Sequence, residues 1–483
     1  MTEVDWFGLG GLVLQVVLAL IVAIFVSANR KPESAIAWMM TVVFLPLVGI
    51  IGFALIGAQR LPRRRRDKQR HVSELIMART EGGLARASRR DQWPDWLPPV
   101  ARMNETLGAL PMVGGNSSDL IEYYRAAIMA IADDIDQATR TVHVEFFILI
   151  HDDITAPFFD ALRRACERGV EVRVLSDHFT QFTYPARRKT QRMLAEMGAH
   201  YQPMLPLRPL RGRWQRPDLR NHRKLVTIDG IVAHTGSLNM IADHYHKRKG
   251  IKRGLHWHEL MIRFEGPIVR ELDAVFVTDW YSETDELLPL DYSPVRLDTG
   301  DRDAQVIPSG PSFDNDNNLK LFAAVIHNAR HRVSITSPYF VPDSTIQLAM
   351  ITAAARGVDI ELFVSATSDQ FMVYHAQRSY YEQLLRAGVR IYLYGEPTIL
   401  HAKHLSVDDD VAIIGSSNLD IRSLSLHMEL MVLLHGRDVV DELRVVQDEY
   451  RQASRLLTLE DWLKRPRHEK LLDNVMRLTS SLM

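Results

Sequence analysis

The sequence pattern H-x-K-x4-D-x6-G-S-x-N occurs twice in this chain of 483 residues. Each copy fixes six residue types over eighteen positions, so two chance matches in one chain are not expected. The first copy consists of His222, Lys224, Asp229, Gly236, Ser237 and Asn239, and the second of His401, Lys403, Asp408, Gly415, Ser416 and Asn418. The repetition predicts two similar halves that each contribute one motif to a shared site.

The residue types in the motif fit the demands of phosphodiester chemistry. A phosphodiester repels nucleophiles through its anionic oxygens, so a site must supply cations, a nucleophile and a proton donor for the leaving alkoxide. Lys224 and Lys403 would neutralise the phosphate. Four side chains would donate hydrogen bonds to its oxygens: Ser237, Asn239, Ser416 and Asn418. One imidazole would attack phosphorus while the other transfers protons, and this chemistry needs no metal or other cofactor.

The chain resembles the phospholipase D superfamily and, more narrowly, its bacterial cardiolipin synthases. The resemblance rests on the two motifs and on the stretches TVHVEFFIL, RNHRK, SPYFVPD, LHAK and GSSNLDIRSL, at residues 141–149, 220–224, 337–343, 400–403 and 415–424. Together with two apolar N-terminal segments, it covers nearly the whole chain. It implies two α/β halves around one cleft and turnover through a covalent phosphohistidine, with His222 favoured over His401 as the nucleophile.

The same resemblance implies a membrane-bound phosphatidyltransferase that makes cardiolipin from two molecules of phosphatidylglycerol and releases glycerol. The motifs alone leave alternatives open. A hydrolytic phospholipase D or another transphosphatidylase would use the same histidines, and acceptor binding and water exclusion would decide between them. A nuclease of the same superfamily is less favoured, because the chain has two apolar segments and no extended basic face on the catalytic halves.

The two halves also repeat outside the motifs. In each half an apolar β-branched run, beginning at Val142 or Val333, precedes a helical stretch and a second run. The helical stretches are expected at Pro157–Arg168 and Ile346–Arg356, and the second runs at Glu171–Leu175 and Asp359–Val364. This order is typical of βαβ units, so we expect an α/β fold with a mainly parallel sheet in each half. The first domain is expected at residues 111–295 and the second at residues 296–483, ending in an amphipathic helix.

Acidic residues are expected to orient the histidines, because a nucleophilic imidazole needs a hydrogen-bond acceptor on its other ring nitrogen. In the family that the chain resembles, this acceptor is a carboxylate that follows the Gly-Ser-x-Asn segment. Glu429 occupies that place in the second half, and Glu259 is the candidate in the first, after a basic stretch at residues 244–256. Although Asp229 and Asp408 belong to the catalytic motif, we expect them to form structural salt bridges at strand ends rather than to transfer protons.

Two apolar segments near the N-terminus, Phe7–Ala28 and Ala35–Ala58, contain no charged side chain. At about 1.5 Å per residue each is long enough to cross a bilayer, so we expect a transmembrane hairpin in residues 1–58. The arginines Arg63–Arg66 follow it in a basic linker, residues 59–110. By the positive-inside rule they place the catalytic halves on the cytoplasmic side of a bacterial inner membrane, where they would meet anionic lipid.

The remaining composition argues against other classes of partner. A formal net charge of −1 gives no reason to expect a general polyanion binder, so no nucleic-acid partner is expected. The single cysteine, Cys166, excludes an intrachain disulfide and a cysteine-based zinc cluster. The histidines lack a carboxylate-rich ligand set, so no metal is expected. The expected partners are phosphatidylglycerol and membrane lipid, and the sequence does not specify the oligomeric state.

Overall fold

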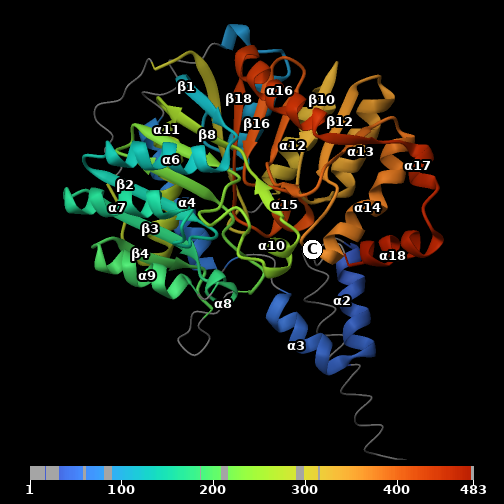
Figure 1. Ribbon diagram of the computed structural model, residues 1–483, viewed down its shortest axis with the longest axis horizontal. Helices are drawn as coiled ribbons and strands as arrows, with labels where there is room; N and C mark the ends of the chain where they lie inside the picture. The colour runs from blue at the N-terminus through green and yellow to red at the C-terminus, as the bar shows by residue number, and fades with distance from the viewer. Residues whose placement is uncertain are drawn as a thin grey trace, which may run out of the picture.

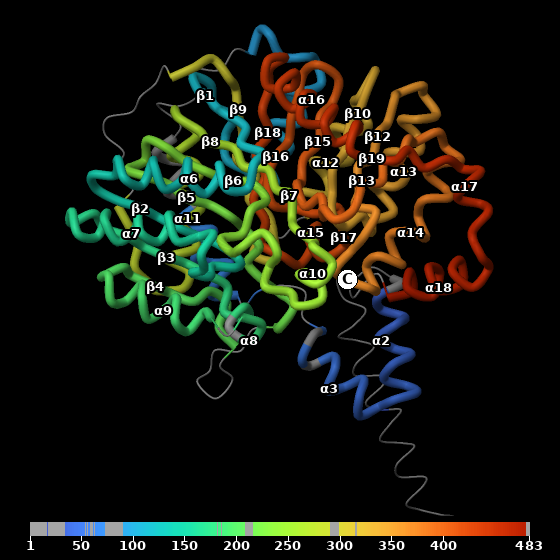
Figure 2. Tube along the Cα trace, in the orientation of Figure 1, coloured from blue at the N-terminus to red at the C-terminus, as the bar shows by residue number. Residues whose placement is uncertain are grey.

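The computed structural model describes residues 17, 32–57, 61, 63–80, 90–184, 186–207, 216–289, 299–313 and 316–479. Two α/β halves stand side by side in Figure 1, with the N-terminal helices extending from one end of the body. The trace in Figure 2 shows that the first half is built from the earlier part of the chain and the second from the later part. The duplicated α/β architecture expected from the sequence is therefore present.

The strands follow the repeat. In the first half they are β1 (Val113–Ile121), β2 (Thr141–Phe146), β3 (Glu171–Asp177), β4 (His200–Met204), β5 (Lys224–Ile228), β6 (Val232–Gly236), β7 (His256–His258) and β8 (Met261–Glu265). In the second half they are β9 (Arg302–Ser309), β10 (Arg332–Thr336), β11 (Phe340–Val341), β12 (Asp359–Ser365), β13 (Arg390–Tyr394), β14 (Thr398–Leu400), β15 (His404–Val407), β16 (Val411–Gly415), β17 (Leu419–Asp420), β18 (Glu429–His435) and β19 (Ser454–Leu457). Fifteen of them form one sheet in the order β19-β13-β12-β10-β15-β16-β18-β9-β1-β8-β6-β5-β2-β3-β4.

Helices cover both faces of this sheet. Those before and in the first half are α2 (Pro32–Phe44), α3 (Pro46–Ile56), α4 (Arg63–Thr80), the 3-10 turn η2 (Arg90–Gln92), α5 (Leu97–Thr106), α6 (Tyr124–Asp136), α7 (Ala156–Glu167), α8 (Thr180–Thr183), α9 (Arg187–Glu196), α10 (Arg248–Lys252) and α11 (Ile268–Thr284). Those in the second half are α12 (Asn317–Asn328), α13 (Ser344–Ala355), α14 (Phe371–Arg386), α15 (Ile421–Ser425), α16 (Arg437–Gln452), α17 (Leu459–Leu463) and α18 (Arg467–Arg477).

The sheet is mixed, so the prediction of mainly parallel sheets was wrong. Only the βαβ segments are parallel within it. β2 pairs with β3 and β3 with β4, and in the second half β10 pairs with β12 and β12 with β13. The strands that carry the motifs, β5 with β6 and β15 with β16, are antiparallel. Three-residue turns at 229–231 and 408–410 join them, and such short connections allow only antiparallel neighbours.

The two halves share the sheet rather than merely touching. β9, the first strand of the second half, pairs with β1 on one side and with β18 on the other, antiparallel in both cases. Apolar residues of both halves, including Phe264, Ile262, Val306 and Val432, therefore belong to one buried cluster. The halves are joined by backbone hydrogen bonds and a common core.

Apolar spacing explains how the helices cover the sheet. On α13 the buried positions include Ile346, Ala349, Met350 and Ala353, a spacing of three and four residues that places them on one helix face. They pack in the same cluster as Val333 and Ile335 of β10. The helical stretches and second strands expected in each half are observed as α7, α13, β3 and β12.

The segment at residues 59–110, expected as a basic linker, contributes to the folded body. Trp93, Trp96, Leu97 and Val100 are buried in the core of the second half. The Trp93 indole Nε1 also donates a hydrogen bond to Asp303 at 2.5 Å. Residues of this segment are therefore part of the hydrophobic core of the second half.

The second apolar segment does not form one long helix. Pro46 begins α3 and α2 ends at Phe44, so the segment is divided into helices of 13 and 11 residues. Proline favours the first turn of a helix and lacks the amide that would continue the preceding one. Among the described residues, no helix combines the length and apolarity that a membrane crossing requires. The first segment, Phe7–Ala28, lies outside the described residues except for Val17.

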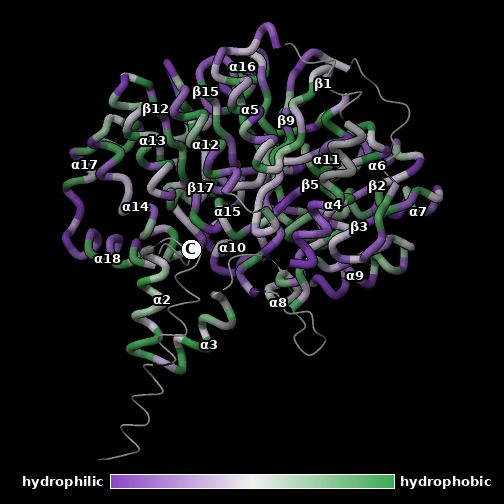
Figure 3. Tube along the Cα trace, turned by 180° about the vertical axis from the view of Figure 1, so that it is seen from behind, coloured by the Kyte–Doolittle hydropathy of each residue, from purple (hydrophilic) through white to green (hydrophobic). Residues whose placement is uncertain are grey.

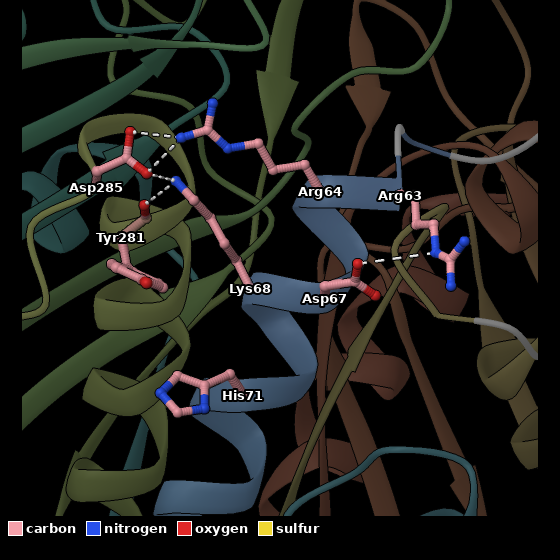
Figure 4. A pocket seen from close by; sticks show the side chains of 7 residues that line it. All are labelled: Arg63, Arg64, Asp67, Lys68, His71, Tyr281 and Asp285. Atoms are coloured by element: carbon pink, nitrogen blue, oxygen red, sulfur yellow. Dashed lines mark hydrogen bonds and ion pairs between the residues drawn. The ribbon is translucent and has the colours of Figure 1, made fainter.

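Helix α4 is fixed to α11 by ion pairs (Figure 4). Arg64 and Lys68 contact Asp285 at 3.1 and 2.5 Å beside a pocket that Tyr281 also lines. Arg65 lies 2.6 Å from Glu283, and both side chains are largely buried. Two of the arginines expected to meet anionic lipid are therefore paired with carboxylates of the protein itself.

The Gly-Ser turns of the two motifs allow very close backbone contact, and alanine is expected to disrupt it. A Cβ on Gly236 would lie 2.3 Å from the carbonyl oxygen of Leu260, and one on Gly415 would lie 2.1 Å from that of Leu430. Gly236→Ala and Gly415→Ala should each lower the free energy of unfolding by at least about 2 kcal/mol, measured by denaturant titration. Gly250→Ala is the control, because its nearest new contact is 3.7 Å away. Unchanged stability of the first two variants would contradict the prediction.

Candidate active site

The structure brings both His-x-Lys pairs to the same edge of the sheet, beyond the carboxyl ends of β2 and β10. Lys224 begins β5 and pairs with Phe146, the last residue of β2. Lys403 directly precedes β15, whose first residue, His404, pairs with Thr336 at the end of β10. The carboxyl ends of parallel strands are where α/β sheets commonly bind ligands.

Each motif histidine is held by a glutamate of the other half. His222 Nδ1 lies 3.0 and 3.1 Å from the two carboxylate oxygens of Glu429. His401 Nδ1 lies 2.7 Å from Glu259 Oε1. Both glutamates singled out in the sequence therefore contact imidazoles, but the pairs are exchanged between halves, which the sequence pattern did not indicate.

Backbone pairing between the halves explains why His401 of the second half meets Glu259 of the first. β7 and β14 form a short parallel ladder in which His258 lies opposite Leu400. These are the residues directly before Glu259 and His401. The His401 amide also donates to the carbonyl oxygen of His258 at 2.7 Å. The two side chains therefore emerge together from paired backbone.

The pair of His222 and Glu429 is built in the same way. Asn221 and Met428, which directly precede His222 and Glu429, form an isolated parallel bridge. The His222 amide donates to the carbonyl oxygen of Met428 at 2.8 Å. The two crossings are thus equivalent in the duplicated fold, and neither would exist in one half alone.

Both imidazoles are neutral near pH 7. Burial lowers the pKa of His222, and the positive charges of Lys224 and Lys403 lower it further. Burial also lowers the pKa of His401, against the opposing effect of Glu259. A neutral imidazole that donates its Nδ1 proton to a carboxylate carries a lone pair on Nε2, as a nucleophile or base requires.

The two orienting glutamates differ in how firmly they hold a negative charge. Burial raises the pKa of Glu429 to about 8, although Lys224 and the Ser416 hydroxyl act in the opposite direction. Burial also raises the pKa of Glu259, but the effects of His401, Lys403 and Ser237 together outweigh it and leave the pKa below its ordinary value. Glu259 is therefore ionised at neutral pH, whereas Glu429 lies close to its protonation point.

The two motif lysines supply the cations of the site. Burial lowers the pKa of Lys224 to about 7 and that of Lys403 to about 8. Lys224 Nζ donates to the His222 carbonyl oxygen at 2.5 Å. Lys403 Nζ donates to the His401 carbonyl oxygen and lies 3.0 Å from His401 Nδ1. A phosphate bound beside them would raise both pKa values, because a negative charge favours the ammonium form.

The motif serines hold the glutamate segments in place. Ser416 Oγ donates to Glu429 Oε2 at 2.5 Å and accepts from the Leu430 amide at 2.9 Å. Ser237 Oγ exchanges hydrogen bonds with the backbone of Leu260, at 2.9 and 3.2 Å. We expected both hydroxyls to donate to the phosphate. In the structure they fix the segments of the orienting glutamates, and donation to the phosphate stays a prediction.

The motif asparagines are buried near the same groups, and one of them reveals a residue that the sequence analysis missed. Asn239 Nδ2 donates to Tyr245 Oη at 3.0 Å, and that hydroxyl donates to Glu259 Oε1 at 2.8 Å. Tyr245 therefore links the first motif to the acceptor of His401, and no pattern around it signalled this. Asn418 Oδ1 is buried and has no hydrogen-bond partner among the described residues.

His427 is a second residue that the sequence analysis missed. Its ring centroid lies 5.7 Å from that of His222, and its Nδ1 lies 3.8 Å from Glu429 Oε1. Within the described part of the chain, these three residues form the group whose ligand atoms could approach one metal ion. A metal there would compete with the hydrogen bond between His222 and Glu429, so the group fits an imidazole–carboxylate pair better. Its position two residues before Glu429 was the available signal.

The motif aspartates lie away from the histidines and tie strands together. Asp229 accepts hydrogen bonds from the amides of Thr139, Arg140 and Thr141, each at 2.8 Å, and Asp408 from those of Arg330, His331 and Arg332, at 2.9, 2.7 and 2.8 Å. These bonds to backbone amides stand where salt bridges were expected. At about 3.3 Å per residue, β5 separates Asp229 from Lys224 by roughly 16 Å.

Comparison with known proteins agrees with this arrangement. The family described as "Cardiolipin synthase, PLD-like domain" matches residues 131–280 and 322–450, and "Phospholipase_D-nuclease N-terminal" matches residues 16–57. Cardiolipin synthase A of Proteus mirabilis is 31% identical over 463 residues, 94% of each chain. Cardiolipin synthase A of Serratia proteamaculans is 30% identical over 491 residues, which cover 99% of this chain and 97% of the relative.

A solved structure shares the fold. The crystal structure of phosphatidylserine synthase from Haemophilus influenzae superposes with a TM-score of 0.59 over 80% of this chain and 100% of the other. The two sequences are 13% identical, so the likeness concerns the fold alone.

Phosphate capture by Lys224 is expected to weaken as the pH rises above about 7. The ammonium form binds the anion, so deprotonation of the free enzyme should lower kcat/KM for an anionic phosphodiester, by up to about tenfold per pH unit. Binding should take up protons, measurable by calorimetry in buffers of different ionisation enthalpy. In Lys224→Arg the guanidinium stays charged, so the decline near pH 7 should disappear. A flat wild-type profile between about pH 6 and 9 would contradict this.

Proposed function

The chain belongs to the family of cardiolipin synthases with phospholipase D-like domains, and on this premise we propose that it transfers a phosphatidyl group between two phosphatidylglycerol molecules and releases glycerol. One observation carries the proposal: each motif histidine has a glutamate side chain of the opposite half on Nδ1. This leaves Nε2 of each histidine to act on a phosphate, one as nucleophile and the other as proton carrier.

In the first step, His222 Nε2 attacks the phosphorus of one phosphatidylglycerol. On substrate binding His401 takes up a proton at Nε2 from solvent. The bond from phosphorus to the headgroup glycerol then breaks, and the His401 imidazolium gives this proton to the departing oxygen. Ionised Glu259 stabilises the imidazolium form of His401, and the bound phosphate raises the pKa of His401 further. The products are free glycerol and a phosphatidyl group on His222, with Lys224 and Lys403 neutralising the phosphate.

In the second step, the terminal hydroxyl of another phosphatidylglycerol enters the place that glycerol has left. His401, now neutral, takes the hydroxyl proton while the oxygen attacks phosphorus. The bond between phosphorus and His222 Nε2 breaks, which releases cardiolipin. His401 then carries again the proton that it held when the first substrate was bound, and His222 is neutral, so the cycle consumes no cofactor and needs no metal.

We assign the nucleophile to His222 rather than His401, in keeping with the family resemblance. The charges around the two histidines support this choice. The ionised Glu259 favours a protonated partner and suits His401 to acid–base work, whereas burial and the positive charges of Lys224 and Lys403 lower the pKa of His222 and keep it neutral. A neutral imidazole is the form that attacks phosphorus.

Transfer to an alcohol is favoured over hydrolysis by the seclusion of the site. The side chains of His222 and His401 are only 12% and 6% exposed, which limits the approach of bulk water. A hydrolytic phospholipase D or a transphosphatidylase with another acceptor is the second candidate, because the same histidines would serve it. A nuclease is less favoured, since the net charge of −1 offers little attraction to a polyanion.

We further propose that the protein acts at the bacterial inner membrane, with its catalytic halves on the cytoplasmic side. The apolar residues of positions 1–58 support this location, together with the basic residues that follow them. Its partners are then phosphatidylglycerol and the anionic lipids around it, and no nucleic acid. Neither α2 nor α3 alone is long enough to cross a bilayer, so any crossing by the second segment has to use both.

Incubation of the purified full-length protein with phosphatidylglycerol alone is expected to yield cardiolipin and glycerol in equal amounts, measured by lipid mass spectrometry and an enzymatic glycerol assay. Phosphatidic acid with glycerol would instead indicate hydrolysis and contradict the transfer step. The absence of any product, with folded protein confirmed by circular dichroism, would contradict the assignment of phosphatidylglycerol as substrate.

His222→Ala and His401→Ala are each expected to reduce turnover by more than the ~10²–10⁴-fold typical of losing one general acid or base, because both residues act on the same phosphate. His200→Ala, at an exposed histidine of β4, is the control and should remain active. Acid quench during turnover of labelled phosphatidylglycerol should leave label on the peptide that contains His222. Label on the peptide that contains His401 would reverse the assignment of the nucleophile.

A further inference from the structure

Exposed apolar side chains follow equivalent strands in the two halves, β3 in the first and β12 in the second. After β3, the residues Phe179 and Phe182 project from the short helix α8, and Phe182 is 65% exposed. After β12, Phe371 and Met372 begin α14, and Phe371 is 63% exposed. Since β3 and β12 are equivalent in the repeat, the duplicated fold presents an apolar pair at corresponding places.

The pair on α8 lies beside the first histidine. The Phe179 ring is 5.8 Å from the guanidinium of Arg220, which precedes His222 by two residues. Asp177, at the end of β3, accepts a hydrogen bond from the amide of Asn221 at 2.9 Å. The exposed phenylalanines are therefore fixed at the edge of the site.

The pair on α14 lies beside the second histidine. Asp369, two residues before Phe371, accepts a hydrogen bond from Tyr339 Oη at 2.8 Å. The Tyr339 ring lies 6.1 Å from that of His401. Each histidine thus has an exposed apolar pair within a short chain of contacts.

Helix α10 adds a basic rim next to the second pair. Lys247, directly before α10, forms an ion pair with Asp369, and Arg253, directly after it, donates to Thr367 at 2.8 Å. The exposed residues between them are Arg248, Lys249, Ile251 and Lys252. Among the described residues, these three cations have no ion-pair partner, and Ile251 stands exposed among them.

Helix α18 extends the apolar surface. Its inner side is held by Asp473, which contacts His375 of α14 at 2.7 Å and Arg465 at 2.5 Å. Its outer side carries exposed apolar residues at a spacing of four and three: Leu471, Val475 and Leu478. The helix is therefore anchored through polar groups and turns an apolar stripe away from the body.

These elements lie at one end of the molecule. In Figure 1, and in Figure 3 from behind, α8, α10 and α18 lie along the lower edge, from which α2 and α3 extend. Figure 3 also shows that α2 and α3 carry many hydrophobic residues. Helix α16, whose Val445 is 62% exposed, lies at the upper edge. Among the described residues outside α2 and α3, the other exposed large apolar side chains are separated from one another along the chain, for example Met129, Leu348 and Leu456.

We propose that Phe179, Phe182, Ile251, Phe371, Met372, Leu471, Val475 and Leu478 form a docking surface that inserts into the headgroup layer of an anionic bilayer. The choice of a lipid occupant rests on the proposed function. The continuity of this docking surface with α2 and α3 and the cations of α10 support it, since apolar insertion and anionic lipid act together in interfacial binding. Both histidines then open toward the bilayer, and substrate reaches them without leaving it.

Spin labels on the full-length protein test the proposal. In a Cys166→Ser background, labels are placed through Phe182→Cys, Phe371→Cys and Leu471→Cys, with Val445→Cys as the matched control. The protein is reconstituted in vesicles of phosphatidylcholine and phosphatidylglycerol, and collision with oxygen is compared with collision with a water-soluble nickel complex. We expect oxygen to dominate at the first three positions and the nickel complex to dominate at position 445.

Two outcomes would overturn the docking surface. Nickel access at positions 182, 371 and 471 equal to that at 445 would place all of them in water. Shielding from both reagents would instead indicate a protein partner or a second copy of the chain. Neither readout requires turnover, so an enzyme without cardiolipin synthase activity would refute the proposed function and still report on insertion.

A kinetic measurement gives a second test. The double variant Phe182→Ser/Phe371→Ser should lose about tenfold more activity on phosphatidylglycerol vesicles than on a short-chain phosphatidylglycerol below its micelle concentration, because burial of two phenylalanines is worth several kcal/mol. Val445→Ser should show the same activity as the unmodified protein on both. Equal losses of the double variant on the two substrates would contradict a docking role and indicate damage to the site itself.

Discussion

The parallel backbone contacts between the two halves are the interaction on which the site depends. β7 pairs with β14, and Asn221 bridges Met428, so each half presents its glutamate to the histidine of the other. A hydrogen bond across a protein interface usually adds to a site that already exists. Here the crossed pairs create it, because an imidazole without its carboxylate lacks a fixed tautomer and orientation. The continuous sheet holds both crossings in register, and the common core prevents the halves from separating.

The crossed pairs sit in a buried cluster of ionisable groups whose pKa values are shifted by burial and by one another. Burial favours neutral lysines and neutral histidines, while the carboxylates favour charged ones, so small changes in surroundings shift protons within the cluster. A bound phosphate is such a change, because its negative charge favours the ammonium forms of Lys224 and Lys403, which burial disfavours. The pKa of Glu429, raised to about 8, and the lowered pKa of Glu259 make the two crossings electrostatically unequal. A fold that repeats itself thereby offers two histidines suited to different tasks.

The sequence predicted much of this and missed the rest for identifiable reasons. The histidines were found because their spacing repeats along the chain, and β3 and β12 because apolar runs mark buried strands. The glutamates were found because the chain resembles a family in which a carboxylate follows the Gly-Ser-x-Asn segment. The mixed sheet was missed because βαβ periodicity dominates the pattern, whereas the antiparallel motif strands are set by short turns. Tyr245 was missed because folding within the first half, and no sequence pattern, brings it between Asn239 and Glu259. His427 was missed because its contact with His222 crosses between the halves. Pro46 divides the second apolar segment, a break that mean apolarity does not reveal.

Helix α11 connects helix α4 to the segment that carries His222. Near its carboxyl end, Glu283 pairs with Arg65 of α4, and one turn earlier Asp279 pairs with Arg223, the neighbour of His222. Both ion pairs are largely buried, so they fix the position of the His222 segment relative to α4. The separation between His222 and α4 is therefore set by a rigid helix and two ion pairs, and not by a flexible linker.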